Sequence, residues 1–402
     1  MSASVVTHSA YPASDEPKVR VPWTVWAGAL AVTSASIGGA WDVSWHRSIG
    51  RDSFLTPAHL AIYACGVIAF FVCAYLIFAT TFGKSARLRQ ESVQVLGFRA
   101  PLGAFIAAWG GIAMLTSAPF DNWWHNAYGL DVKIISPPHT VLILGIRAVS
   151  VGMTFLILAA MNRLIAASES RPLDVDDAAA LRTLRGLFLY LGGLTMVGQM
   201  FFLQEQTWDV RLHTTGAYVA LGIGMPMAFA AFSRASGNRW ACTICAGVYT
   251  AFVILEILLL PLFPASPKLG PVFNPVTHLV PAKFPILIVI PAIALDLLWA
   301  RLRYWKHWQI ALVSGVVFVA LIFAVEWPFA TFLLSKASEN RFFGTTYFDY
   351  NSGPHSYDRL RLFIAPMSGA PLFFGLMRAS IYAFLSTWLG LTFGKWMRGV
   401  QR

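Results

Sequence analysis

Residues 41–60 read WDVSWHRSIGRDSFLTPAHL and separate two long apolar runs. A second stretch at 120–141 reads FDNWWHNAYGLDVKIISPPHTV and has nearly the same pattern. Charged and imidazole side chains are costly at the edge of a membrane span, because they lose water there unless they find a partner. The first stretch nevertheless gathers four such residues, namely Asp42, His46, Asp52 and His59. Both stretches therefore predict a functional site at a membrane face, at the junction where one helix ends and the next begins. Such a junction is called a corner below.

The composition assigns these corners to a membrane protein. Of 402 residues, 57% are hydrophobic and 12% are charged, whereas soluble domains contain about 25% charged residues. Apolar runs close to the ~20 residues that cross a bilayer recur along the whole chain. We therefore predict an all-α, polytopic transmembrane bundle with helices at 22–44, 57–83, 100–124, 137–162, 184–204, 215–233, 240–263, 284–300, 307–334 and 370–394.

The basic residues predict how the bundle lies in the membrane. Of the 30 lysines and arginines, 18 fall on the side that holds both termini and the loops at 84–99, 163–185, 234–239 and 301–306, and 10 fall on the other side. Because basic residues collect in cytoplasmic loops, we expect both termini in the cytoplasm and the chain in an inner or plasma membrane. Contact of these loops with anionic lipid accounts for the net charge of +11, so nucleic acid is not expected as a partner.

The predicted spans divide the chain into two halves. We expect a cytoplasmic tail at 1–21, a four-helix half at 22–165 that contains both quoted stretches, a cytoplasmic linker at 166–183 and a six-helix half at 184–402. On this topology seven of the nine histidines map to the outer face, namely His46, His59, His125, His139, His213, His278 and His355. Histidines with only a packing role would be distributed over both faces, so we expect the functional site to lie at the outer face.

The two stretches align as a repeated unit in which an aspartate precedes a histidine by one helical turn. The pairs are Asp42 with His46 and Asp121 with His125. Residues four apart share one helix face, so each pair can grip one ion. Glycine and then aspartate follow at matching positions in both copies, namely Gly50 and Asp52, then Gly129 and Asp131. The glycines allow a tight loop that returns the chain over the helix end.

Each unit ends in a helix start of the form [ST]-P-x-H, which runs from Thr56 to His59 in the first copy and from Ser136 to His139 in the second. The serine or threonine predicts an N-cap and the proline the first helical position, which puts the histidine in the first turn. Each corner thus offers two imidazoles and one carboxylate, the ligand set of a 2-His-1-carboxylate iron centre, and one that also suits copper or zinc. The alternative is that each Asp–His pair only hydrogen-bonds and caps a helix end.

Fainter copies follow in the six-helix half. The order of residues from Trp208 to His213 matches that from Trp41 to His46, and an asparagine precedes histidine by four residues at His278 and at His355. These copies lack the second histidine, so they predict either degenerate sites or structural positions. Residues that we expect to act as further ligands, or to orient the imidazoles, are Asp52, Asp131, Asp209, His213 and Arg147.

Ionisable residues also fall within the predicted spans, namely Arg147, Glu256, Asp296, Glu326 and Arg378. Such residues usually face the protein interior and find partners there. Glu256 and Arg147 lie deep enough to form an ion pair between helices. The other interpretation is a proton or ion path beneath the outer face.

The spacing Asp-x3-His-x12-His that starts at Asp42, followed by Asp-x3-His-x13-His at Asp121, resembles that of a known family. It is similar to the C subunit of the copper membrane monooxygenases, the group of particulate methane and ammonia monooxygenases. In that family one such motif supplies a copper site and a second motif, which opens with asparagine, supplies another. The resemblance covers residues 42–139 and implies two copper sites, other membrane subunits as partners and a small apolar substrate.

Four functions from different classes follow. The first is a copper-dependent, monooxygenase-like oxidoreductase subunit, and the second is a membrane transporter or metal-delivery protein that uses the same histidines as a loading site. Against the transporter, no pair of interrupted helices is visible at matching positions in the two halves. A bis-imidazole haem protein is disfavoured because Pro57 and Pro137 interrupt the segments between the histidines. The fourth is a structural membrane subunit without a metal.

Overall fold

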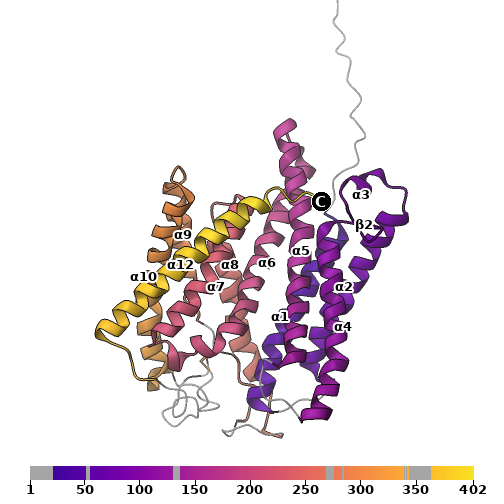
Figure 1. Cartoon of the computed structure of the whole chain (residues 1–402). Helices are drawn as coiled ribbons and strands as arrows, with labels where there is room; N and C mark the ends of the chain where they lie inside the picture. Colours follow the sequence, from indigo (N-terminus) through magenta and orange to yellow (C-terminus); the bar gives the residue numbers. More distant parts are fainter. Residues whose placement is uncertain are drawn as a thin grey trace, which may run out of the picture.

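The described part of the chain forms an almost entirely helical bundle. The computed structural model describes residues 21–50, 55–129, 136–268, 276–282, 285–338, 340, 342–343 and 364–402. Long helices run side by side between the two ends of the molecule, and the last one crosses the bundle obliquely (Figure 1). The prediction of an all-α bundle is confirmed.

All the helices that the sequence predicts are present. They are α1 (Trp23–Ser48), α2 (Pro57–Phe82), α4 (Leu102–Tyr128), α5 (Pro137–Ser170), α6 (Val175–Thr207), α7 (Thr215–Ser236), α8 (Ala241–Leu259), α9 (Val289–Arg301), α10 (His307–Leu333) and α12 (Gly369–Met397). The shorter elements are helix α3 (Ala86–Gln90), the antiparallel strands β1 (Val93–Val95) and β2 (Phe98–Ala100), and the 3-10 turns η1 (Asp209–Arg211), η2 (Leu260–Leu262) and η3 (Lys336–Ser338). The small hairpin β1–β2 lies in a loop for which the sequence predicted no structure.

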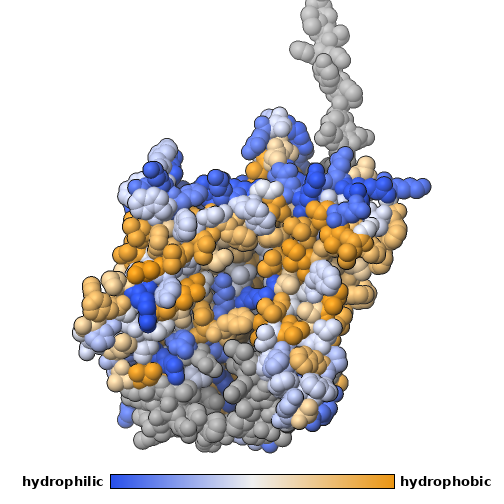
Figure 2. Space-filling view, viewed as in Figure 1, coloured by the Kyte–Doolittle hydropathy of each residue, from blue (hydrophilic) through white to orange (hydrophobic). Residues whose placement is uncertain are grey.

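The lengths and surfaces of the helices agree with a multi-pass membrane protein. Within the described residues, eight helices are long and apolar enough to cross a membrane. Helix α1 has 26 residues but ends in a polar stretch, and α9 has 13 residues and is only about 20 Å long, less than the ~30 Å of a bilayer core. The surface carries a broad hydrophobic band below a hydrophilic end (Figure 2).

The loops that the sequence assigns to one side of the membrane lie together. Helix α3, the hairpin β1–β2, the turn between α5 and α6, and the C-terminus are all at the upper end of the bundle in Figure 1. The ends of α1 and α4 that carry the Asp–His pairs point to the opposite end. This sorting is the one that the predicted topology requires. That the upper end faces the cytoplasm remains a prediction from its basic residues.

Close backbone packing joins α1 to α2 and α4 to α5, the two pairs of helices that carry the Asp–His motifs. A side-chain carbon on Gly110 of α4 would lie 2.6 Å from the carbonyl oxygen of Gly145 on α5, and one on Gly145 would lie 2.8 Å from the Gly110 oxygen. In the first hairpin, a carbon on Gly38 would lie 2.8 Å from the backbone nitrogen of Ile62. Small residues let membrane helices approach until their backbones touch. The aspartate of one helix and the first-turn histidine of the next are thereby held at the same corner.

The start of α9 differs from the prediction. The sequence predicts a helix from residue 284, but α9 begins at Val289, and the described residues 276–282 and 285–288 before it are not helical. This segment is nevertheless buried at Val280 and Ala282. Its prolines, Pro281 and Pro285, remove backbone donors and break the helix. Apolar composition alone does not distinguish such a buried extended segment from a span.

Candidate metal centre

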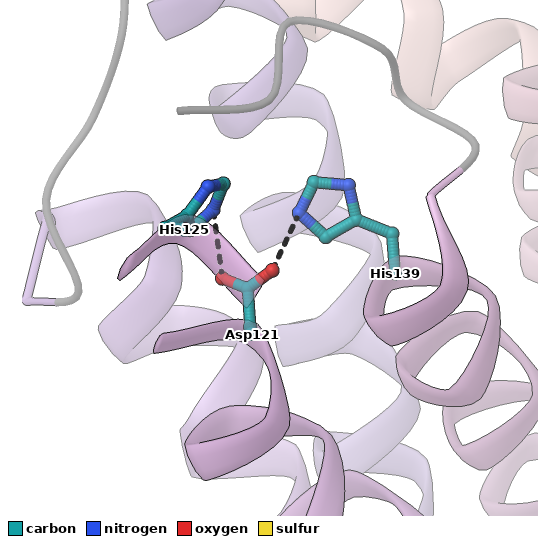
Figure 3. A group of neighbouring side chains, drawn as sticks. All are labelled: Asp121, His125 and His139. Carbon is teal, nitrogen blue, oxygen red and sulfur yellow. Dashed lines mark ion pairs between the residues drawn. The ribbon is translucent and has the colours of Figure 1, made fainter. Parts of the chain in front are cut away.

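The corner between α4 and α5 brings one carboxylate against two imidazoles. Asp121 and His125 lie one turn apart near the end of α4, with Asp121 Oδ2 3.3 Å from His125 Nε2. His139 lies in the first turn of α5, and its Nε2 is 3.5 Å from Asp121 Oδ1. Both imidazoles point toward the carboxylate, one to each oxygen (Figure 3). The structure thus brings together the three residues that the motif groups.

The N-cap of α5 fixes the position of His139. The side chain of Ser136 accepts a hydrogen bond from the backbone N–H of His139, at 3.4 Å, and Pro137 takes the first helical position. An N-cap of this kind satisfies a backbone donor that would otherwise lack a partner. The residue that caps the helix therefore also orients the backbone of the second imidazole.

The three ligand atoms of this corner lie close enough for one ion. One atom each from Asp121, His125 and His139 can be chosen so that all lie within 4.8 Å of one another. Two atoms that bind one metal at about 2.0–2.2 Å lie roughly 3–3.6 Å apart, and the two oxygen-to-nitrogen distances fall in that range. A charge-assisted hydrogen bond would be shorter, at about 2.7–2.9 Å. The spacing is therefore compatible with shared ligation of one ion.

One oxygen of the aspartate adds to this argument. Asp121 Oδ1 is buried and accepts no hydrogen bond, although His139 lies nearby. A buried carboxylate oxygen without a hydrogen bond is costly, and a bound cation is one way to satisfy it. The side chains of Asp121, His125 and His139 are 22%, 19% and 25% exposed, so none of the three is fully enclosed.

The corner between α1 and α2 has the same design. Asp42 Oδ1 lies 3.3 Å from His59 Nε2, and Asp42 Oδ2 lies 3.9 Å from His46 Nε2. Thr56 caps α2, and its side chain accepts a hydrogen bond at 3.2 Å from the backbone N–H of His59. The buried Asp42 Oδ1 again accepts no hydrogen bond. Among the described residues, however, only the Asp121 trio has all three ligand atoms within 4.8 Å, so the first corner is the more open one.

The glycines that follow the two histidines have the conformation that the loop requires. Gly50 has φ 103° and Gly129 has φ 85°, values that side chains disfavour. At the second corner Gly129 directly follows α4, and its carbonyl oxygen lies 3.4 Å from His125 Nδ1. The predicted aspartates Asp52 and Asp131 lie outside the described residues.

The third, fainter copy does not form a similar corner. His213 follows η1, and its Nε2 lies 3.1 Å from the carbonyl oxygen of Trp327 and 3.0 Å from Thr331 Oγ1, both on α10. Burial lowers the pKa of this imidazole, which favours its neutral form. His213 thus connects the start of α7 to α10. The side chain of Asp209, and the partner asparagines and His355 of the last two copies, lie outside the described residues.

Arg147 and Glu256 do not form the ion pair that the sequence suggested. Arg147 donates from Nη1 to the carbonyl oxygen of Thr195 at 3.4 Å, and its guanidinium lies 5.6 Å from the ring centre of Phe202. Glu256 accepts a hydrogen bond from the backbone N–H of Ala282. The prediction of this pair is wrong, because each group binds a separate backbone partner, while Arg147 Nη2 and Glu256 Oε2 make no hydrogen bond.

Sequence reasoning missed Arg47, which follows the first-corner histidine. Its Nη1 donates to the carbonyl oxygen of Pro281 at 3.1 Å, and its guanidinium lies 4.0 Å from the ring centre of Trp208. Next to it, Ser48 Oγ accepts a hydrogen bond at 2.7 Å from the backbone N–H of Val280. The first corner is therefore anchored to the second half of the chain. The only signal for this anchor in the sequence is an arginine near the end of the first predicted span.

Comparisons of the chain with protein-family models, with curated proteins and with solved structures returned no match. The case for a metal centre therefore rests on the repeated motif and on the geometry of the two corners.

Proposed function

We propose that the chain is an integral membrane metalloprotein that binds a transition metal through Asp121, His125 and His139. A second metal is bound at the α1–α2 corner by Asp42, His46 and His59. The observation that carries the proposal is the shared carboxylate, which in both corners faces one imidazole with each oxygen and keeps one buried oxygen without a hydrogen bond.

Copper is our first choice of metal, through the resemblance of the motif spacings to the copper membrane monooxygenases. The donor set of imidazole nitrogen and carboxylate oxygen suits iron and zinc as well. When bound, copper would supply redox chemistry toward dioxygen. The chain would hold and orient the metal, and the loop side would admit a small apolar substrate. In this proposal the protein is a monooxygenase-like oxidoreductase that works with other membrane subunits.

Elemental analysis of the purified protein tests this proposal. We expect about two metal ions per chain in the wild type, with loss of one in His46→Ala, one in His125→Ala and both in the double variant. His307→Ala is the matched control, because His307 begins α10 at the opposite end of the bundle. Metal content that is unchanged in the double variant, or a wild type without copper, iron or zinc after expression with these metals, would overturn the proposal.

A transporter or metal-delivery protein is the second candidate function. The break before α9 favours it, because non-helical backbone inside a membrane protein is typical of transport sites. In this function the two corners would load the metal at the outer face. Metal uptake by proteoliposomes that Glu256→Gln abolishes would favour this candidate. Uptake no faster than in protein-free vesicles would exclude it.

A further inference from the structure

Two buried acids bind the non-helical residues before α9, which are described at 276–282 and 285–288 and are called the broken segment below. The backbone N–H of Ala282 donates to Glu256 Oε1 on α8, and the N–H of Leu287 donates to Glu326 Oε1 on α10, both at 2.9 Å. Glu256 is 6% exposed and Glu326 is fully buried. They lie about one and two turns from the ends of their helices, on the side of the bundle that carries the two corners.

Each of these acids has an oxygen that the fold does not use. Glu256 Oε2 and Glu326 Oε2 are both buried and accept no hydrogen bond. A neutral amide side chain would satisfy the same backbone N–H through its single oxygen. Holding the segment therefore does not require a carboxyl group at either position. A carboxyl group differs from the amide in that its second oxygen can take up and release a proton.

A third buried acid shows what a purely structural role looks like. Asp296 on α9 accepts hydrogen bonds with both oxygens, from the backbone N–H groups of Cys242 and Thr243 and from the Thr243 hydroxyl, at 2.7–3.1 Å. It caps the start of α8 and keeps no oxygen free. Glu256 and Glu326 are equally buried but lack this second set of donors.

Polar groups from several elements surround the two acids. Tyr249 donates its hydroxyl to the carbonyl oxygen of Pro285 at 3.0 Å and lies within electrostatic reach of both Glu256 and Glu326. Tyr218 of α7 is within electrostatic range of Glu326, and Arg47 of α1 is within electrostatic range of Glu256. Polar side chains from α1, α7 and α8 therefore accompany the two acids, and two of them, Arg47 and Tyr249, bind the carbonyl oxygens of Pro281 and Pro285.

The ligand that this arrangement fits is a proton. Metal sites need several converging donors, and among the described residues neither glutamate joins a group of three acid, histidine or cysteine ligands within 4.8 Å. The two acids also bind different N–H groups, five residues apart along the segment. One carboxyl oxygen is sufficient to hold one proton. Ionisable groups within membrane spans commonly mark proton paths.

We propose that Glu256 and Glu326 form a proton-exchange site on the broken segment before α9. A proton adds to the free Oε2 of each carboxylate to give a neutral acid, and it returns to water without any redox change. This site does not depend on the metals of the two corners. It is connected to the first of them by Arg47, which follows His46 on α1 and donates a hydrogen bond to Pro281 of the segment.

Infrared spectroscopy of metal-free protein in lipid nanodiscs tests the proposal through the carbonyl stretch of protonated carboxylic acids. We expect a component at the frequency of carboxyl groups shielded from water that appears as the pH falls, and we expect Glu256→Gln and Glu326→Gln each to remove about half of that component. Glu169→Gln is the control, because Glu169 is an exposed glutamate near the end of α5. Glu256→Asp and Glu326→Asp keep an acid and should keep the band, at a shifted pH.

The glutamine variants retain an oxygen for the backbone N–H, so we expect them to fold, with thermal unfolding as the check. A titrating band that is unchanged in both glutamine variants would overturn the proposal. Loss of the band on addition of sodium or potassium at constant pH would also overturn it, because the acids would then bind a metal cation in place of the proton.

Discussion

The two corners share a local design but differ in their surroundings. In both, a capped first-turn histidine and a histidine one turn after the aspartate face the same carboxylate. The α1–α2 corner is tied to the second half of the chain through Arg47 and Ser48. The α4–α5 corner ends in Gly129, and its exposed neighbours include Trp123 and Tyr128.

This difference shows that the Asp-x3-His and [ST]-P-x-H motifs determine the arrangement of the ligands but not their surroundings. The i, i+4 spacing and the [ST]-P-x-H helix start produce the same arrangement of ligands twice, in different environments. The longer Asp42–His46 distance of 3.9 Å, against 3.3 Å for Asp121–His125, accompanies the anchoring of α1 by tertiary contacts. We therefore expect the second corner to bind metal more tightly and the first to matter more for stability.

Removal of the shared carboxylate should have the largest effect on metal binding. Asp121→Ala should weaken binding at the second corner by more than about 100-fold, because loss of a ligand exceeds the 10–100-fold cost of losing a residue that only orients one. Asp42→Ala should weaken the first corner by about 10-fold, since its ligands are less compact. Titration against a competing chelator measures both. Equal losses at the two corners would contradict the ranking.

Removal of Arg47 should lower the stability of the protein more than the matching substitution at the second corner. Arg47→Ala should lower the free energy of unfolding by roughly 2–3 kcal/mol, because it removes a charged hydrogen bond to Pro281 and the contact with Trp208. Asn126→Ala, at the corresponding position of the exposed second corner, should change it by less than about 0.5 kcal/mol. Denaturant unfolding in detergent micelles gives the comparison. Similar losses for both would show that the first corner is not anchored.

Removal of the helix caps should have a smaller and equal effect at the two corners. Thr56→Ala and Ser136→Ala should each cost about 1 kcal/mol of stability, because each leaves the N–H of a ligand histidine without its acceptor. The exchanges Thr56→Ser and Ser136→Thr keep the hydroxyl and serve as controls. A clear difference between the two alanine variants in the same unfolding experiment would show that the two caps do not contribute equally to stability.

The sequence predicted what depends on local spacing. The Asp–His pairs, the caps Thr56 and Ser136, and the return of the second histidine to the aspartate are set by helical geometry and by turn residues close in the chain. The partners of Arg47 and Glu256 were not predictable, because they lie on a segment far away in sequence.

The late start of α9, at Val289 where the sequence predicted residue 284, was missed for a related reason. The residues just before Val289 are apolar apart from Pro285, and the backbone N–H groups of Ala282 and Leu287 are bound by glutamates on two other helices. Only tertiary structure decides between helical and non-helical backbone in such a stretch. The prolines at 281 and 285 were the one local signal against a continuous helix.

X-ray absorption spectroscopy of the bound metal tests the central claim most directly. The two corners contain only nitrogen and oxygen donors, and all four cysteines are buried and free. We predict a ligand shell of nitrogen and oxygen at about 2.0–2.2 Å with the outer scattering of imidazole. A sulfur shell at about 2.3 Å, or a spectrum without imidazole, would contradict the assignment of the metal to these histidines and aspartates.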